Sequence, residues 1–201
     1  SLGAAGIYPV SSVSACLKLG QQGMITAGER GGIKVEAFDL GNSPYHYIES
    51  NVSGRNVAIT TTNGTLAIEK SKGAKEILIG SFLNLSSTVK YLINENQPVL
   101  IHCAGWKGTP NLEDTLYAGA LISHLVKANF DISGDSAQLA LDYYLLNQND
   151  LLGAANKSGH AHRLAGFGVT KDAAFCLNID FYDGFVGKLK DDRIAKNSLM
   201  N

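Results

Sequence analysis

Residues 57–72 read VAITTTNGTLAIEKSK, and this stretch decides the fold class. Residues 57–61 form a short β-branched run typical of a strand, and 65–72 follows as a helix that stops at Gly73. Short apolar runs separated by helical stretches recur at residues 7–10, 24–27, 77–80 and 99–104. The alternation predicts an α/β fold with three layers, α/β/α, around a mixed, mostly parallel sheet.

The other predicted elements follow from periodicity and turn residues. An apolar stripe that a sheet could cover is formed by Leu85, Thr88, Val89 and Leu92. Further helices are predicted at 11–19, 112–126, 136–146 and 151–165, with a last strand at 185–189. A turn cluster at 129–134 predicts two parts: an α/β subdomain at 1–130 with the glycine-rich and threonine-rich loops, and a smaller α-rich subdomain at 131–201 that closes the site.

Length and composition exclude several classes of protein. The chain has 201 residues, of which 45% are hydrophobic and 17% charged, as in ordinary globular proteins. A net charge of −1 gives no field that would attract nucleic acid or an acidic membrane. We expect neither a membrane span nor a signal peptide. The three scattered cysteines suit a reducing compartment, so the expected location is the cytoplasm.

The segment TTTNGT at residues 60–65 is the most informative local motif. A turn between a strand and a helix directs backbone N–H groups at one point, and hydroxyls add further donors. We therefore predict that a phosphate or sulfonate is held by Thr61, Thr62, Asn63, Gly64 and Thr65. The alternative is a plain helix cap followed by a tight glycine turn. The motif lacks the Gly-Lys-Ser/Thr ending of a nucleotide-binding P-loop.

A second motif, AGERGG at residues 27–32, follows a predicted strand. Arg30 could grip a phosphate, sulfonate or carboxylate with two parallel hydrogen bonds, and Glu29 could ligate a cation. The alternative is a glycine-rich surface turn with solvated side chains.

A third motif, FDLGNSP at residues 38–44, brings a carboxylate, an amide and a hydroxyl into one loop, at Asp39, Asn42 and Ser43. These side chains could bind a ligand, or they could only stabilise a turn before Pro44.

A fourth motif follows the predicted strand at 99–104. Asn111 is a predicted helix cap, and Glu113 and Asp114 lie in the first turn of that helix. The two carboxylates could hold Mg²⁺ or move a proton, or serve the helix end alone. His160 and Arg163, three residues apart on a predicted helix, could face one anion together.

Together and in this order, the motifs resemble the 2-phosphosulfolactate phosphatase family. The resemblance rests on AGERGG (27–32), FDLGNSP (38–44), TTTNGT (60–65), ILIGSFLN (77–84), CAGWKG (103–108) and LEDTLYAGAL (112–121), and more faintly on SGHAHRL (158–164) and KDAAFCLNID (171–180). It implies a Mg²⁺-dependent phosphatase that hydrolyses 2-phospho-3-sulfolactate to sulfolactate and phosphate, a step of coenzyme M synthesis in methanogens.

The resemblance also implies roles for the residues singled out above. The catalytic residues would be Arg30 and Asp114, and the Mg²⁺ ligands Asp39, Glu113 and Asp114. The small phospho-sulfo-acid substrate would be bound by Glu29, Asn42, Ser43, residues 61–65, His160 and Arg163. Members of the family usually begin with a strand of the type VIDVLRA, whose Asp and Arg are expected in the site, and no residue here occupies those positions.

Two alternatives for the function remain open at this point. The chain could be a non-catalytic anion-binding module, or a phosphatase of another small phosphorylated acid. Its assembly as a homodimer is an open option.

Overall fold

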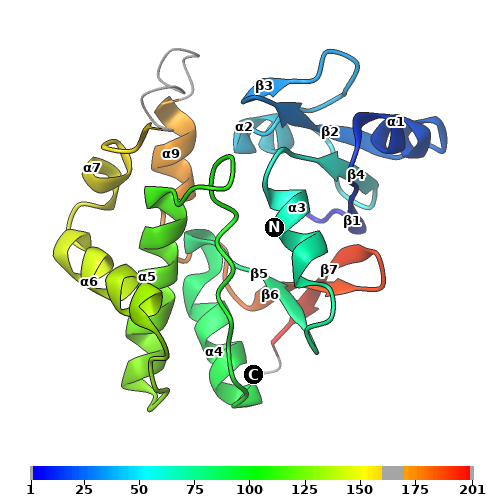
Figure 1. Ribbon diagram of the computed structural model, residues 1–201. Helices are drawn as coiled ribbons and strands as arrows, with labels where there is room; N and C mark the ends of the chain where they lie inside the picture. Colours follow the sequence, from blue (N-terminus) through cyan, green and yellow to red (C-terminus); the bar gives the residue numbers. More distant parts are fainter. Residues whose placement is uncertain (1, 160–169, 200–201) are drawn as a thin grey trace. The chain divides into compact units, whose positions relative to one another are not determined.

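The computed structural model describes residues 2–159 and 170–199 (Figure 1). The chain forms two compact units. Unit 1 contains the residues up to Ile79 together with Gly187–Ser198, and unit 2 contains the residues from Gly80 to Val186 together with Leu199. The chain therefore passes from unit 1 to unit 2 and back.

A mixed sheet organises unit 1. Its strands lie in the order β3-β2-β4-β1-β7-β6-β5. The strands are β1 (Gly6–Pro9), β2 (Ile25–Arg30), β3 (Ile33–Lys34), β4 (Asn56–Thr60), β5 (Ile77–Ile79), β6 (Phe185–Lys190) and β7 (Arg193–Ser198). The pairs β2–β4 and β4–β1 are parallel, whereas β2–β3, β1–β7 and β5–β6 are antiparallel. The mixed sheet of an α/β fold is thus confirmed, with the parallel strands β2, β4 and β1 side by side.

Helices cover both faces of these parallel strands. Successive side chains of β4 point to opposite faces, so each face of the sheet has apolar side chains to bury. Ala58 packs with Cys16 of helix α1 (Val13–Gln21), and Phe38 joins the same cluster. Val57, on the other face, packs in a cluster that Tyr47 of helix α2 (Pro44–Ile48) borders. The three-layer arrangement follows from this alternation. Helix α3 (Gly64–Ser71) follows β4.

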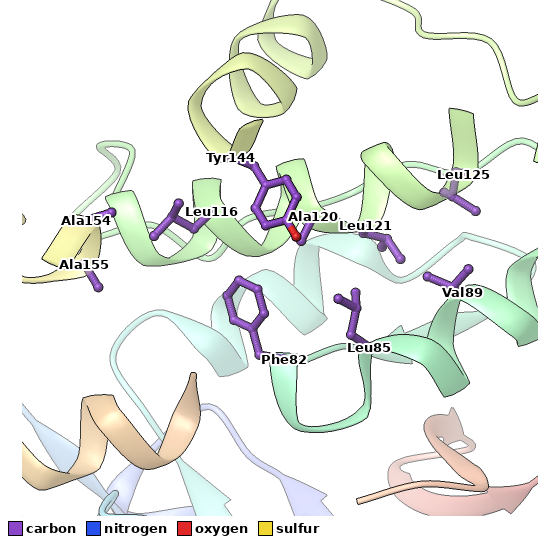
Figure 2. Close-up of a cluster of buried hydrophobic side chains, with 10 residues drawn as sticks. All are labelled: Phe82, Leu85, Val89, Leu116, Ala120, Leu121, Leu125, Tyr144, Ala154 and Ala155. Atoms are coloured by element: carbon purple, nitrogen blue, oxygen red, sulfur yellow. The ribbon is translucent and has the colours of Figure 1, made fainter. Parts of the chain in front are cut away.

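Unit 2 is built from helices around a separate hydrophobic core (Figure 2). Its helices are η1 (Phe82–Asn84), α4 (Leu85–Glu95), α5 (Leu112–Lys127), α6 (Asp135–Asn147), α7 (Leu151–Ala155) and α9 (Thr170–Cys176). Leu85 and Val89 of α4 point toward Leu121 of α5, and Tyr144 of α6 approaches from the opposite side (Figure 2). The stripe on α4 is therefore covered by a helix, not by the sheet that we expected.

The close contact of α5 with α6 places these two helices in one core. A Cβ atom on Gly119 would lie 2.0 Å from the carbonyl oxygen of Ala140, so only glycine allows the approach. The expected subdomain boundary near residue 130 lies between these helices, inside unit 2. The division in the structure falls instead at Ile79 and at Val186, and the helical unit is neither the smaller part nor confined to the C-terminal residues.

The end of unit 2 is fastened to the start of α4 by two carboxylates. Asp180 accepts hydrogen bonds from the backbone N–H of Ser86 (2.7 Å) and from its hydroxyl (2.5 Å). Asp183 accepts from the Ser87 hydroxyl at 2.9 Å. The Ser87 hydroxyl and the Gly184 N–H lower the pKa of Asp183 below its ordinary value. These bonds satisfy donors at the first turn of α4 and hold segments about ninety residues apart in sequence.

The predicted strand at 99–104 is wrong. The segment is irregular, although Val99 and Ile101 pack against the core of unit 2 and Leu100 between them is 91% exposed. The alternation of apolar side chains is present, but no described strand pairs with it. Of the predicted helix at 151–165, residues 151–155 are helical, and residues 160–169 lie outside the described part.

No described helix is long and apolar enough to cross a membrane.

Candidate functional site

The strands β2 and β4 bring two of the predicted loops together. Gly28 of β2 is paired with Thr60 of β4 in parallel register, so the residues that follow them, 29–30 and 61–62, lie at one edge of the sheet. Gly28 has a φ of +140°, and a Cβ atom there would lie 1.9 Å from the carbonyl oxygen of Thr60. Glycine is required for this approach of the two backbones.

The carboxylate of Glu29 joins the two turns that follow these strands. Glu29 is only 6% exposed. Its Oε1 accepts a hydrogen bond from the Thr62 N–H at 2.7 Å. Its Oε2 accepts from the Gly32 N–H at 2.7 Å and from the Thr62 hydroxyl at 3.2 Å. Three donors thus satisfy a buried carboxylate, as burial of a charge requires.

The guanidinium of Arg30 is held by backbone and hydroxyl oxygens. Its Nη1 donates to the carbonyl oxygens of Glu29 (2.6 Å) and Thr60 (3.3 Å), and its Nη2 donates to the Thr60 hydroxyl at 2.8 Å. Thr60 itself is completely buried. The Nε–H and the second hydrogen on Nη2 make no hydrogen bond to any described residue. The half-buried guanidinium is therefore fixed in orientation and keeps donors that an anion could use.

The threonine-rich turn is organised largely by its own hydroxyls. Thr61 Oγ1 accepts from the Thr65 N–H at 3.2 Å, and the Thr65 hydroxyl donates to the Thr61 carbonyl at 2.9 Å. Asn63 is the N-cap of α3, but its side chain makes no capping hydrogen bond. The helix begins at Gly64. The Thr62 N–H and hydroxyl, which we predicted as donors to a phosphate, bind Glu29 instead.

A pocket of about 240 Å³ opens beside this turn within unit 1. The hydroxyl-bearing residues Ser11, Thr61, Thr62 and Thr65 line it. Lys72 also lines it and forms a 2.7 Å ion pair with Glu69. Space for a small polar molecule thus lies next to several of the predicted binding residues, where β1 and β4 end.

Two side chains of the loop at 38–44 stabilise the structure of unit 1. Asp39 Oδ2 accepts from the Thr26 N–H and from the Thr26 hydroxyl, both at 2.8 Å. The Thr26 N–H bond is the main cause that lowers the pKa of Asp39, and the charges of Arg55 and Lys34 contribute. Ser43 caps α2 by accepting from the Tyr45 N–H at 3.3 Å.

Asn42 in the same loop is exposed. The sequence left open whether Ser43 binds a ligand or only stabilises a turn. The capping hydrogen bond of Ser43 fits the second role, which needs no ligand. Asp39 keeps a second carboxylate oxygen, and its predicted role at a metal stays a prediction.

Glu113 and Asp114 belong to unit 2, at the start of α5. Asn111 accepts from the Asp114 N–H at 2.8 Å, as the predicted cap should. Asp114 Oδ2 accepts from the Gly105 N–H at 2.7 Å. Glu113 Oε1 accepts from the hydroxyl of buried Ser158 at 2.6 Å, while its buried Oε2 has no hydrogen-bond partner among the described residues. A pocket of about 200 Å³ in unit 2 is lined in part by Asn111 and Ser158.

Cys103 is not suited to be a nucleophile. Burial of its thiol raises the pKa to about 11, with the charge of Asp114 as a second cause. The reactive thiolate is thus scarce at neutral pH.

The predicted Mg²⁺ ligands are divided between the two units. No group of three His, Cys, Asp or Glu side chains that could hold a metal occurs in residues 2–159 and 170–199. Asp39 lies in unit 1, whereas Glu113 and Asp114 lie in unit 2. His160 and Arg163 fall outside the described residues, so their predicted binding roles stay predictions.

Two residues to which the sequence analysis gave no role of their own prove important. Thr60 fixes the guanidinium of Arg30, and Thr26 binds Asp39. Both are buried polar residues inside strands. A hydroxyl in an otherwise apolar strand was the available signal, because a buried hydroxyl needs a hydrogen-bond partner.

Unit 1 therefore belongs to the class of α/β proteins in which charged and hydroxyl side chains collect at the carboxyl ends of parallel strands. Such proteins bind small ligands at this edge of the sheet.

The chain belongs to the 2-phosphosulfolactate phosphatase family, whose model matches residues 1–192. The relatives of this chain include two proteins named "Probable 2-phosphosulfolactate phosphatase". One, from Thermotoga petrophila, is 40% identical over 182 residues, which cover 90% of this chain and 78% of the relative. The other, from Caldanaerobacter subterraneus subsp. tengcongensis, is 36% identical over 193 residues, or 94% and 80%. The resemblance inferred from the motifs is confirmed, and proteins of that name are phosphoric monoester hydrolases.

Replacement of Asp39 by asparagine tests its structural role. We expect Asp39→Asn to lower the free energy of unfolding at pH 7 by about 1–2 kcal/mol, because a neutral amide oxygen accepts the two hydrogen bonds from Thr26 more weakly than a carboxylate oxygen does. The pKa of Asp39 is lowered in the folded state, so its contribution is present above the unfolded pKa and is lost as pH falls through the folded pKa. Urea unfolding at neutral and acid pH measures this difference.

The exposed Asp131→Asn variant serves as the control. The wild type and Asp39→Asn should converge in stability in acid. A difference that stays the same at every pH would contradict the assignment.

Proposed function

We propose that this protein hydrolyses 2-phospho-3-sulfolactate to 3-sulfolactate and phosphate, with Arg30 binding an anionic group of the substrate at the edge of β2 and β4. Family membership and the names of the relatives support the reaction. One observation supports this site. The guanidinium of Arg30 is fixed by Thr60 and by the carbonyl oxygen of Glu29, and it keeps N–H donors that these residues do not use.

The chemistry of the substrate suits this edge of unit 1. The molecule carries a phosphate, a sulfonate and a carboxylate, so its recognition requires several N–H and O–H donors and few apolar walls. Over the whole reaction, the bond from phosphorus to the C2 oxygen breaks, an oxygen atom from water is added to phosphorus, and the C2 oxygen takes up a proton. A fixed guanidinium stabilises the negative charge on the phosphoryl oxygens in the transition state.

The magnesium requirement rests on the family resemblance alone. The described residues do not gather three metal ligands, so the roles of Arg30 and Thr60 are assigned without a metal ion. The place of the reaction in coenzyme M synthesis and the cytoplasmic location are likewise proposals. The role of Asp114 as a catalytic carboxylate and the role of Glu113 as a Mg²⁺ ligand stay predictions.

Release of phosphate from 2-phosphosulfolactate by the purified chain tests the reaction. With Mg²⁺ present we expect release well above the uncatalysed rate, reduced about tenfold or more by EDTA and restored by excess Mg²⁺, because a bound cation neutralises phosphoryl charge. A folded chain that binds inorganic phosphate but releases none from the ester would contradict the proposal and favour the anion-binding module. Release that EDTA does not change would overturn the magnesium requirement only.

Replacement of Arg30 tests its place in the site. We expect Arg30→Ala to lower kcat/KM by about tenfold or more, because a charge-assisted hydrogen bond to the reacting group is lost. Arg30→Lys keeps the positive charge but lacks the planar guanidinium, so its kcat/KM should lie between the values of the wild type and of Arg30→Ala. Steady-state kinetics with the exposed Arg55→Ala variant as control measure the effect. Unchanged kinetics for Arg30→Ala would remove Arg30 from the site.

A further inference from the structure

The most unusual group at the edge of β2 and β4 is a buried carboxylate in a place where an anion is expected to bind. Glu29 is more than nine-tenths buried, and each of its oxygens accepts a backbone N–H. Its carbonyl oxygen also accepts from Arg30 Nη1 at 2.6 Å. The residue therefore contacts both turns and the guanidinium that we place in the site.

We propose that Glu29 is a positioning residue, whose carboxylate fixes the turn at 60–62 and, through Thr60 of that turn, the guanidinium of Arg30, and which does not itself bind substrate or metal. This inference rests on the proposed function. It replaces the expected role of Glu29 as a substrate or cation ligand. It also removes Thr62 from the direct ligands, because the N–H and the hydroxyl of Thr62 are both bonded to Glu29.

Only a carboxylate satisfies the donors that surround this position. Oε1 faces the Thr62 N–H, and Oε2 faces the Gly32 N–H, so both atoms must be acceptors. A glutamine at position 29 would turn its NH₂ group toward one of these two N–H groups, leaving that buried donor without a partner. The geometry thus distinguishes Glu from Gln at nearly equal volume.

The buried carboxylate is electrostatically unfavourable for anion binding, which indicates that Glu29 is there to fix the structure of the site. A carboxylate beside an anion site repels the ligand, unless a cation compensates for its charge. The guanidinium of Arg30 donates to the main-chain carbonyls of Glu29 and Thr60 and to the Thr60 hydroxyl, and it makes no ion pair with the Glu29 carboxylate among the described contacts. The carboxylate holds Thr62, and Thr60 in the same turn orients Arg30, so the two turns and the guanidinium are held as one hydrogen-bonded group before any ligand binds. Such preorganisation favours binding because less freedom is lost when the ligand arrives.

Amide hydrogen exchange, measured by NMR, tests the positioning contact without any assay of activity. In Glu29→Gln we expect exchange at the Thr62 or Gly32 amide to be about tenfold faster or more, because one hydrogen bond of that pair is lost. The amides of Val57 and Ala58 in β4 should exchange as in the wild type. The matched control is Glu36→Gln, the same change at an exposed position of unit 1. Unchanged exchange at both Thr62 and Gly32 would overturn the proposal.

A double-mutant cycle with inorganic phosphate tests whether Glu29 acts through Arg30. We expect Glu29→Gln to weaken phosphate binding several-fold, and the combined Glu29→Gln and Arg30→Ala variant to bind no more weakly than Arg30→Ala alone. Additive losses would indicate that Glu29 affects phosphate binding independently of Arg30. Tighter binding by Glu29→Gln would indicate a residue that only repels anions. Either result would overturn the proposal.

The same variants separate failure of this inference from failure of the proposed function. If the wild type releases no phosphate from the ester, the reaction is wrong, while exchange and phosphate binding still decide the role of Glu29. Should Glu29→Gln not fold, Glu29→Asp takes its place. It keeps the charge but is one methylene shorter, so it cannot span both turns, and the same two measurements apply.

Discussion

The hydrogen bonds from the Thr62 and Gly32 amides to the carboxylate of Glu29 are the interaction on which the candidate site depends. They join the turn after β4 to the turn after β2, and the paired strands between them supply a rigid base. Gly28 allows this junction, since any side chain there would meet the Thr60 carbonyl. Arg30 then receives its orientation from Thr60. A charged group is thus held in place by buried polar atoms at the end of a parallel sheet.

Unit 2 depends on a different constraint, the close packing of small residues between helices. Gly119 lets α5 approach α6, and the core shared with α4 fills the space with leucine and aromatic side chains. Asp180 and Asp183 then fasten the end of the unit to the first turn of α4. Glu113 and Asp114 lie in this framework, at the start of α5, each with one carboxylate oxygen already hydrogen-bonded.

Elements with strong local patterns could be predicted from the amino-acid sequence. The parallel strands at residues 7–10, 24–27 and 57–61 were predicted because β-branched runs and helical stretches alternate, and the ends of two of these strands led to Arg30 and to the turn at 61–65. The strand at 99–104 failed because alternation of apolar residues shows a half-buried extended segment but not a partner strand. The strand β7 was missed because the segment RIAKNS at 193–198 is short and polar.

The roles of individual site residues were harder to predict, because hydrogen-bond partners lie far apart in sequence. Glu29 and Thr62 are 33 residues apart, farther than any local motif extends, and Asp39 reaches Thr26 through a loop. A carboxylate in a glycine-rich loop fits the role of a ligand as well as that of an internal acceptor. Only the fold shows that Glu29 has its acceptor atoms occupied by the protein itself.

The most direct test of a site at the edge of β2 and β4 is to map the binding of inorganic phosphate on the backbone amides by NMR chemical shifts. We predict that the largest shifts on titration occur in unit 1, at Arg30 and its neighbours and at residues 61–66. Shifts confined to unit 2, around the pocket at Asn111 and Ser158, with unit 1 unchanged, would contradict a site at this edge.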